Sequence, residues 1–509
     1  MLIRVHGATL HGIDGVLVSV EVDAGRGLPA FHIVRQGDRV VNESRDRIRS
    51  AFRQCGLEFP PGRVTVNLAP TGIPKAGSAL DLPIALGIAA TRIELPTKKL
   101  ACTLFVGELG LDGKLHPVRG MLPLVAAGQA AGLAEAVTPS PNLEEASVCP
   151  AIRVRGADDL GAVVRFVRSD EALIEGRVGW QHSPDDSRPE LDLADVRGQE
   201  TAKRALEVAS AGAHNILLIG PPGSGKTLLS RRLSGLLPAL TFEDALEATR
   251  IHSVAGTLSG RSLILRPPFR APHHTTSDAG MTGGGKPLRP GEVSLAHRGV
   301  LFLDELPEFR RPVLEALRQP LEEGVIRLVR SHATAELPAR FQLVAAMNPC
   351  PCGHRGDPSR DCSCDDAQVR RYRSKLSGPL LDRIDLHVPV PSVPWRTVTR
   401  AESASESSRA VRTRVCRARD VQQHRYRGSP YHINAELPTR AIRLHCEVSD
   451  DAARLLERSV QQLRLSMRAY VRVLRVARTI ADLEDSKTIA AAHIAEAVSY
   501  RMLDQSRGP

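Results

Sequence analysis

The pattern of hydrophobic and polar positions divides the chain into three parts separated by two polar stretches. In residues 1–168, strand-like apolar runs at 15–22 and 64–68 alternate with turns rich in glycine and proline, and an alanine-rich helical stretch follows at 122–131. This mixture predicts an α+β domain. Residues 169–190 show no apolar periodicity, so we expect a linker there.

The second half of the chain has a different pattern. In residues 191–391, helical periodicity alternates with short apolar strands at 215–219, 299–303 and 341–346, which is typical of βαβ units and predicts a parallel sheet. Residues 392–408 form a second polar linker, and helical periodicity dominates 409–509. The predicted fold class is therefore α/β, with an N-terminal α+β domain and a C-terminal helical domain.

A phosphate-binding loop is the most specific motif in the chain. It fits the pattern G-x4-G-K-T, follows an apolar strand and precedes a helical stretch. Backbone N–H groups of such a loop wrap phosphate oxygens, the lysine reaches the outer phosphates and the hydroxyl ligates Mg²⁺. We expect ATP and Mg²⁺ at Gly220, Pro221, Pro222, Gly223, Ser224, Gly225, Lys226 and Thr227.

Two later strands end in polar residues that suit the same chemistry. The apolar run 301–303 ends in Asp304 and Glu305, as a Walker B strand does. We expect Asp304 to hold the magnesium shell and Glu305 to polarise the attacking water. The next strand ends at Asn348, which is our candidate for the sensor 1 residue near the terminal phosphate.

The composition of the chain limits the classes of possible binding partners only partly. The net charge is +11, which favours a polyanionic partner, but contact with phosphates needs clustered charge rather than a surplus. Aromatic residues make up 3% of the chain, which argues against a reader of single strands that works by base stacking. The run 409–427 holds seven arginines and one acidic residue, and either a DNA-facing surface or a solvated helix face explains it.

The chain shows neither a membrane span nor a signal peptide. The longest apolar stretch, 82–91, is about half of the roughly 20 residues needed to cross a bilayer. The N-terminus has no basic segment followed by an apolar one. We therefore expect a cytoplasmic protein without a membrane partner.

Four of the nine cysteines are clustered in what we expect to be an insert at 350–364. Cys350, Cys352, Cys362 and Cys364 form two C-x-C pairs, and four thiolates suit tetrahedral Zn²⁺. All four positions would be filled by protein, which favours a structural role over a catalytic one. Disulfides and a metal-free cysteine-rich loop are the alternatives, and a reducing compartment argues against the first.

Further motifs carry a resemblance to a known family. Together with Gly-Pro-Leu-Leu-Asp-Arg-Ile-Asp-Leu at 378–386, the motifs above resemble those of AAA+ ATPases of the magnesium-chelatase group. The resemblance implies that Arg383 enters the ATP site of a neighbouring subunit. Residues 465–483 are similar to the family's lid helix, which implies that Arg468 is sensor 2 and contacts the γ-phosphate. For Arg472, Arg475 and Arg478, a solvated basic face explains the pattern at least as well.

Two segments, 266–277 and 283–299, resemble the helix-2 insert region of the ComM/YifB subfamily within this group. Segments at 27–31, 43–51, 66–70 and 81–87 resemble the subfamily's opening domain, which is similar to the Lon protease fold; the stretch 35–38 departs from the pattern. The resemblance covers 1–168 and 191–503. It implies a homo-hexameric, ATP-driven DNA motor that promotes branch migration or helicase action during DNA integration in natural transformation.

In this family the helix-2 insert and the hairpin before sensor 1 face the ring pore, which makes Lys286, Arg289, Arg327 and Arg330 candidate DNA-facing residues. Two other functions stay open. One is a magnesium-chelatase motor subunit, which the N-terminal domain and the four-cysteine cluster fit poorly. The other is a nucleotide-dependent remodelling protein without helicase activity.

The resemblance to the Lon protease fold also suggests an alternative function, that of a serine peptidase with a Ser/Lys dyad. Ser78 occupies the position of the nucleophile, but the position of the lysine holds Leu124. Lys75 and Lys114 are near in sequence, and neither matches the motif. Since a dyad needs a base within hydrogen-bond reach, we expect a scaffold or a substrate-contact domain rather than a peptidase.

Overall fold

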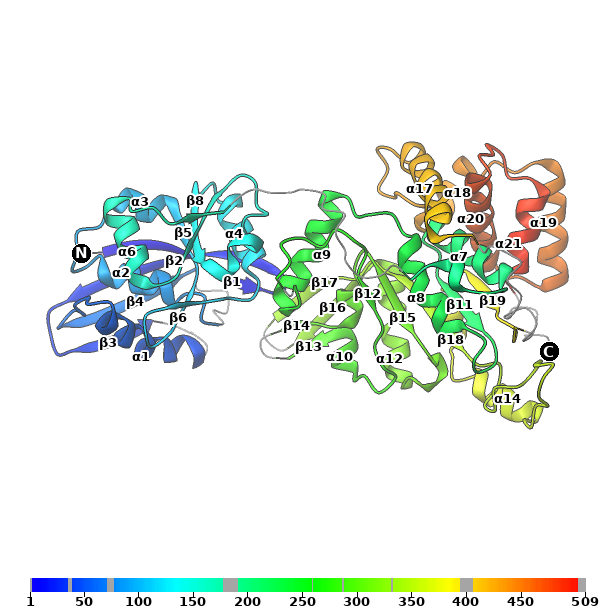
Figure 1. Ribbon diagram of the computed structural model, residues 1–509, viewed down its shortest axis with the longest axis horizontal. Helices are drawn as coiled ribbons and strands as arrows, with labels where there is room; N and C mark the ends of the chain where they lie inside the picture. Colours follow the sequence, from blue (N-terminus) through cyan, green and yellow to red (C-terminus); the bar gives the residue numbers. More distant parts are fainter. Residues whose placement is uncertain are drawn as a thin grey trace.

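The computed structural model describes residues 2–34, 39–70, 77–176, 191–258, 260–285, 288–330, 333–393 and 406–501. Three bodies follow one another along the molecule (Figure 1). An N-terminal α+β domain lies at one end, a parallel-sheet domain occupies the middle, and a helical domain packs on the far side of the middle domain. The mixed α/β fold class predicted from the sequence is confirmed.

The N-terminal domain is built on one eight-stranded mixed sheet in the order β10-β9-β8-β5-β1-β2-β4-β3. Its strands are β1 (Leu2–His11), β2 (Asp14–Gly25), β3 (Ala30–Val34), β4 (Arg63–Ala69), β5 (Thr103–Phe105), β8 (Glu135–Pro139), β9 (Arg153–Ala157) and β10 (Ile174–Glu175). A small hairpin joins β6 (Glu108–Leu109) to β7 (Leu115–His116). The helices are α1 (Arg39–Gln54), α2 (Asp81–Ala89), α3 (Thr97–Cys102), α4 (Met121–Ala130), α5 (Leu143–Ala146) and α6 (Leu160–Ser169).

Burial explains two of these elements. In β4, Val64, Val66 and Leu68 alternate with more exposed residues, as expected for a strand with one face on a core. Every residue of α2 is buried, so the longest apolar stretch of the sequence is a core helix. No helix in the described residues is long and apolar enough to cross a membrane.

The first predicted linker begins later than expected. Helix α6 continues to Ser169, and β10 at 174–175 pairs antiparallel with β9. The N-terminal domain therefore extends at least to Glu175, because a two-residue edge strand completes its sheet. Residues 177–190, the rest of the predicted linker, lie outside the described residues.

The middle domain holds a five-stranded, all-parallel sheet in the order β12-β15-β18-β11-β19. Its strands are β11 (Ile216–Ile219), β12 (Phe269–Arg270), β15 (Val300–Leu303), β18 (Gln342–Met347) and β19 (Leu386–Pro389). The central strands β15 and β18 are buried throughout, because helices cover both faces. The helices are α7 (Glu200–Gly212), α8 (Lys226–Leu236), α9 (Phe242–Ala255), α10 (Asp278–Thr282), α11 (Glu292–Leu295), α12 (Arg311–Ala316), α13 (Arg318–Glu323), α14 (Asp366–Arg373) and α15 (Gly378–Leu381).

Two hairpins extend from this domain. The first pairs β13 (Gly283–Gly284) with β14 (Arg289–Pro290), between α10 and α11. The second pairs β16 (Val325–Arg330) with β17 (Ala333–Pro338) and directly precedes β18. These are the segments for which the sequence predicts the helix-2 insert and the hairpin before sensor 1.

The C-terminal domain is helical and packs on α7 and α8. It consists of α17 (Ser408–Arg425), α18 (Thr439–His445), α19 (Asp450–Leu463), α20 (Met467–Leu483) and α21 (Ala491–Ser499). Arg478 is 1% exposed and shares the buried Asp482 with Arg425. The solvated face considered for the arginines of α20 is therefore wrong for Arg478, because its charge is neutralised inside the domain.

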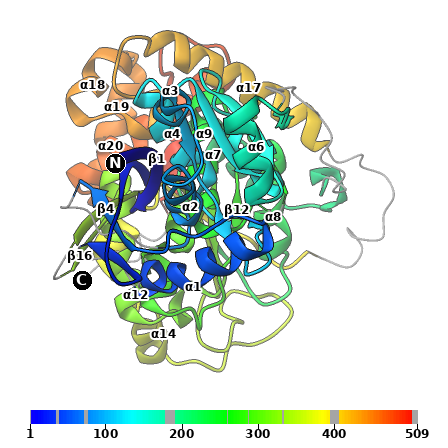
Figure 2. The same cartoon turned by 90° about the vertical axis from the view of Figure 1, so that its left-hand side faces the viewer.

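Helices α4 and α9 join the N-terminal domain to the middle domain (Figures 1 and 2). The Gly120 N–H donates to Ser253 O over 3.1 Å, and the Ser253 hydroxyl donates to Glu145. Burial raises the pKa of Glu145 even though Ser253 and two backbone N–H groups stabilise its charge. Polar groups of both domains thus depend on each other for their hydrogen bonds.

Candidate nucleotide site

The phosphate-binding loop lies between β11 and α8, at the carboxyl end of the parallel sheet. Gly223 and Gly225 have φ values of +76° and +95°, a region that side chains other than glycine rarely adopt. The loop can therefore turn its backbone N–H groups toward a phosphate. Gly220 is also crowded, because a Cβ there would lie 2.0 Å from Val390 O.

Lys226 is held by the loop itself. Its Nζ donates to Gly220 O over 2.7 Å, to Pro221 O over 2.8 Å and to Asn348 Oδ1 over 3.2 Å. Burial lowers the pKa of Lys226, although Asp304 and Glu305 oppose the shift. The hydrogen-bond acceptors of the ammonium group are therefore all neutral, and a polyphosphate would supply the negative charge that it lacks.

The magnesium candidates are also brought together. Thr227 Oγ1 donates to Asp304 Oδ2 over 2.7 Å, although 77 residues separate them in the chain. A hydroxyl and a carboxylate at this distance can share the coordination shell of one Mg²⁺. The sheet order explains the contact, because β11 and β15 both flank β18 and end at the same edge.

Glu305 has an unusual backbone. Its φ is +51°, in the left-handed region, and its N–H donates to Asp304 Oδ1 over 3.0 Å. A glutamate in this region costs of order 1–3 kcal/mol, a strain that occurs mostly at functional sites. The side chain is 58% exposed and extends toward His274, whose Nδ1 lies 3.4 Å from Glu305 Oε2.

Arg383 lies at the opposite edge of the sheet from Lys226. Its backbone carbonyl accepts from Asn215 Nδ2 over 2.9 Å, and Asn215 directly precedes β11. The phosphate-binding loop follows the other end of β11, about 15 Å away at the rise of a β-strand. Its guanidinium pairs with Glu322 and donates to Pro379 O, so Arg383 does not reach the loop of its own chain.

Arg468 lies on the same side as Arg383. Both line one broad cavity of about 1730 Å³ between the middle and helical domains. The hydrogen bond from Arg383, followed by the charges of Arg383 and Arg468, lowers the pKa of Glu322. One turn after Arg468, Arg472 pairs with Asp385 over 2.5 Å. The family resemblance implies that Arg468 contacts a γ-phosphate, and within one chain the structure places it on the wall of the same cavity as Arg383.

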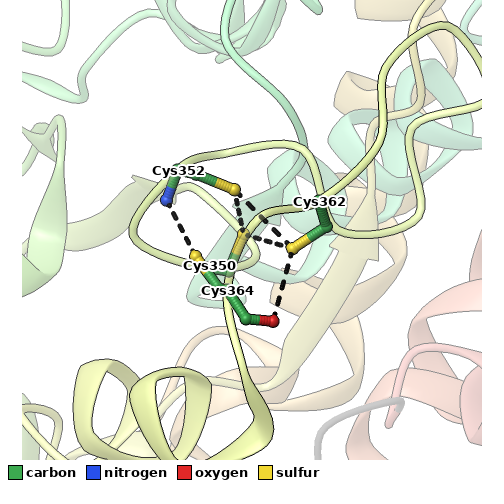
Figure 3. A group of neighbouring side chains, drawn as sticks. All are labelled: Cys350, Cys352, Cys362 and Cys364. Atoms are coloured by element: carbon green, nitrogen blue, oxygen red, sulfur yellow. Dashed lines mark hydrogen bonds between the residues drawn. The ribbon is translucent and has the colours of Figure 1, made fainter.

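The four clustered cysteines converge (Figure 3). Cys350 Sγ lies 3.4 Å from Cys352 Sγ and 3.7 Å from Cys362 Sγ, and the last two are 3.6 Å apart. All four sulfur atoms lie within 4.8 Å of one another, and none forms a disulfide. Zinc–sulfur bonds of about 2.3 Å in a tetrahedron require sulfur separations of about 3.8 Å, so the donor set fits Zn²⁺.

The protein environment also favours a thiolate at one of these positions. A hydrogen bond from the backbone N–H of His354 lowers the pKa of Cys352 to about 5. Cys352 would thus be ionised at neutral pH, and the thiolate is the form that ligates a metal. The side chain of His354 itself faces Asp357, with Nδ1 3.5 Å from Oδ2.

The cysteine loop touches the phosphate-binding loop. Gly353, with φ of +86°, packs so closely on Pro222 that a Cβ would lie 2.6 Å from Cδ and 2.8 Å from Cγ of the proline ring. The same Cβ would lie 3.9 Å from the side chain of Asn348. The loop after Asn348 therefore supports both the sensor candidate and the second proline of the phosphate-binding loop.

The basic candidates for DNA contact turn out mostly to have partners within the chain. In the 409–427 run, three arginines form ion pairs: Arg414 with Glu207 and Glu406, Arg417 with Asp485, and Arg425 with Asp482. A fourth, Arg419, donates to the backbone carbonyl of Ser210. Arg327 pairs with Glu323 and Glu336. Arg289 is exposed in β14. Lys286 and the side chain of Arg330 lie outside the described residues.

Within the described residues, Ser78 has no hydrogen bond to a lysine that could act as the base of a peptidase dyad. The Ser78 hydroxyl donates to Glu108, and Leu124 is fully buried in α4. Lys114 lies 3.6 Å from Asp112. Lys75 and the 35–38 stretch lie outside the described residues.

Two residues at the site were missed from the sequence. Gln199 Nε2 donates to Ser224 O over 3.1 Å and to Pro391 O over 2.6 Å, which ties the phosphate-binding loop to the chain after β19. In the sequence, the sign of Gln199 was a Gly-Gln pair just before a helix. His274 lies within the segment 266–277 that resembles the family, and its contact with Glu305 has no local sequence signal.

We expect Gly353→Ala to raise the dissociation constant for ATP about tenfold, because the new methyl group would push Pro222 and the phosphate-binding loop aside. Gly356→Ala is the matched control. Gly356 also has a left-handed φ, +78°, but nothing lies within 4 Å of the added Cβ. Titration with a fluorescent ATP analogue checks both variants, and equal affinities would show that the contact does not support the nucleotide site.

Comparison with known proteins agrees with these features. Family models match residues 192–398 ("Magnesium chelatase, subunit ChlI"), 20–142 ("Subunit ChlI of Mg-chelatase") and 405–501 ("Magnesium chelatase, subunit ChlI C-terminal"). An uncharacterized protein of Mycobacterium tuberculosis is 45% identical over 508 residues, 99% of each chain. Competence protein ComM of Haemophilus influenzae is 42% identical over 494 residues, 97% of this chain and 96% of its own.

The uncharacterized protein YifB of Escherichia coli is 43% identical over 505 residues, 98% of this chain and 97% of its own. A magnesium-chelatase 38 kDa subunit of Cereibacter sphaeroides is 28% identical over only 30% of this chain. Near full-length similarity thus extends through all three domains of the ComM and YifB proteins, whereas it is partial for the chelatase subunit. Given its phosphate-binding loop, its parallel-sheet core and these matches, the chain belongs to the ComM/YifB subfamily of magnesium-chelatase-like AAA+ proteins, a family that implies ATPase activity.

Proposed function

We propose that the protein is a ring-forming ATPase, a homo-hexamer that moves or remodels DNA and promotes branch migration or unwinding during DNA integration. The observation that supports it best is the separation of nucleotide residues between the two edges of one sheet. Lys226, Thr227 and Asp304 gather at the carboxyl edge, and Arg383 lies at the amino edge. A complete site then needs two subunits.

Within one subunit, the roles follow from the contacts. Lys226 binds the outer phosphates, and Thr227 with Asp304 holds Mg²⁺, which neutralises charge between the phosphates. Glu305 orients and polarises the attacking water as the catalytic residue. Asn348, whose Oδ1 lies 3.2 Å from Lys226 Nζ, contacts the terminal phosphate that Lys226 binds and serves as sensor 1.

Between subunits, Arg383 supplies positive charge to the neighbour's transferring phosphate. An arginine that enters from another chain makes hydrolysis depend on assembly. Arg468 lies on the same side and lines the same cavity, so it reaches the same neighbouring nucleotide. Glu322 holds Arg383 until a nucleotide-bearing neighbour competes for it.

The DNA part of the proposal rests on family similarity over nearly the whole chain to a protein named competence protein ComM. The hairpins β13–β14 and β16–β17 are the DNA-facing elements, and among the described residues of the first, Arg289 is basic and exposed. A magnesium-chelatase role is less well supported, because the chelatase subunit matches about a third of the chain.

ATPase activity measured with and without single-stranded, duplex and branched DNA tests the function. We expect DNA to stimulate turnover, Lys226→Ala to abolish nucleotide binding, and Glu305→Gln to bind ATP normally while hydrolysing it at least about 10²-fold more slowly. Only Glu305→Gln keeps the phosphate contacts and removes the base. Turnover indifferent to every DNA would contradict the motor, and wild-type hydrolysis by Glu305→Gln would contradict the Walker B role.

Subunit mixing tests the role of Arg383. Arg383→Ala should bind ATP through its own Lys226 and hydrolyse it about 10³-fold more slowly. Adding Lys226→Ala subunits should restore part of the turnover, since each defective site then borrows a neighbour's Arg383. The control is the double variant Lys226→Ala/Arg383→Ala, which should rescue nothing. Mixed rings without rescue, or normal hydrolysis by isolated Arg383→Ala subunits, would contradict an arginine acting between subunits.

We further propose that Cys350, Cys352, Cys362 and Cys364 hold one structural Zn²⁺. Metal analysis of protein purified without chelator should find about one zinc per chain, lost in Cys350→Ser/Cys362→Ser with a lower free energy of unfolding, because binding energy at such sites is folding energy. Cys102→Ser, at an exposed cysteine outside the cluster, is the control and should retain the metal. A metal-free wild-type protein would contradict the site.

A further inference from the structure

The carboxylate of Glu305 has an exposed position that its own backbone does not restrain. The backbone of Glu305 lies in the left-handed region. Its N–H donates to Asp304 Oδ1, and its carbonyl accepts from the Glu308 N–H over 2.8 Å, but neither bond holds the carboxylate. A half-exposed glutamate at a strand end can adopt several rotamers. Within the described part of the chain, its carboxylate faces His274, with Nδ1 3.4 Å from Oε2.

The ring of His274 is itself fixed by its neighbours. It lies against His273, with ring centroids 4.1 Å apart, and its edge meets Phe309 at 6.4 Å and an interplanar angle of 82°. His273 is fixed in turn by Thr275 Oγ1, 2.9 Å from its Nδ1. Phe309 is 4% exposed and follows the short helix η3 (Leu306–Glu308) that begins after Glu305. The imidazole is thus placed between two rings.

The segment that carries His274 is anchored at both ends. Before it, Arg270 at the end of β12 forms two hydrogen bonds with Glu292 in α11, of 2.7 and 2.8 Å. After it, the Ser277 side chain caps α10, which leads into the β13–β14 hairpin. The loop 271–277 therefore sets His274 relative to the sheet edge where Glu305 lies.

We infer that His274 is a positioning residue for Glu305: its imidazole holds the carboxylate in the orientation that polarises the attacking water. The inference rests on the proposed catalytic role of Glu305. A separation of 3.4 Å is long for a hydrogen bond, and such contacts tighten when substrate completes a site. Within the described residues, the contacts of His274 are with His273, Phe309 and Glu305 and not with the phosphate-binding loop, so its effect is on turnover and not on nucleotide binding.

Steady-state kinetics and ATP titration of His274→Ala and His274→Asn test the inference. His274→Ala should lower kcat about tenfold, the scale expected when a catalytic group is loosened, while KM and the dissociation constant for ATP stay within about twofold. The asparagine amide nitrogen replaces Nδ1 as a donor, so His274→Asn should recover most of the lost kcat. His116→Ala, at an exposed histidine of the N-terminal domain, is the matched control and should match the wild type.

A double variant separates this inference from the proposed function. In the Glu305→Gln background, adding His274→Ala should cause no further loss of kcat, because the group it positions is gone. If Glu305→Gln is inactive but His274→Ala turns over at or above the wild-type rate, or if His274→Asn and His274→Ala are equally impaired, the positioning role is overturned while the role of Glu305 stands. If Glu305→Gln is fully active, the proposed function itself fails.

Discussion

The order of five parallel strands is the constraint on which the rest of the structure depends. Because β11, β15 and β18 are parallel neighbours, their carboxyl ends meet at one edge. The phosphate-binding loop, Asp304 and Asn348 follow those ends and come into contact there. The buried charge of Lys226 is tolerated because two carbonyls and an amide oxygen accept hydrogen bonds from its ammonium group. A site built this way is ready for a polyphosphate before one binds.

The amino edge of the sheet carries two arginines, whereas the carboxyl edge carries the phosphate-binding loop. Arg383 and Arg468 lie where β11 and β19 begin, and the ion pair of Arg472 with Asp385 attaches the helical domain at that point. Although burial alone would raise it, Arg472 and His214 hold the pKa of Asp385 below its usual value. The helical domain is thus fixed to the edge of the sheet that carries Arg383, which is the edge proposed above to meet a neighbouring subunit.

Two loops outside the sheet contact residues of the same nucleotide site. The cysteine loop presses Gly353 on Pro222, and the loop 271–277 presents His274 to Glu305. On the side of the middle domain that meets the N-terminal domain, α9 connects to that domain through Ser253. These contacts connect the cysteine loop, the first hairpin and the N-terminal domain to the ATPase core, because each shares a packed or hydrogen-bonded group with it.

The sequence by itself determined the parts that local chemistry sets. The periodicity of strands and helices, the phosphate-binding loop and the family motifs predicted an α/β core with two flanking domains, and the fold class and family are confirmed. The four cysteines were also identifiable, since spacing within fifteen residues limits where their sulfurs can lie.

Only the tertiary structure decided which partner each charged side chain has. Arg414 and Arg425 share one helical run, yet they pair with Glu207 and Asp482, which are 207 and 57 residues away. A helical spacing says which face a side chain occupies and nothing about the acceptor opposite it, so the run 409–427 was open to a DNA-facing reading. The contact of His274 with Glu305 was equally hidden, because it forms only when β12 and β15 lie side by side in the folded sheet.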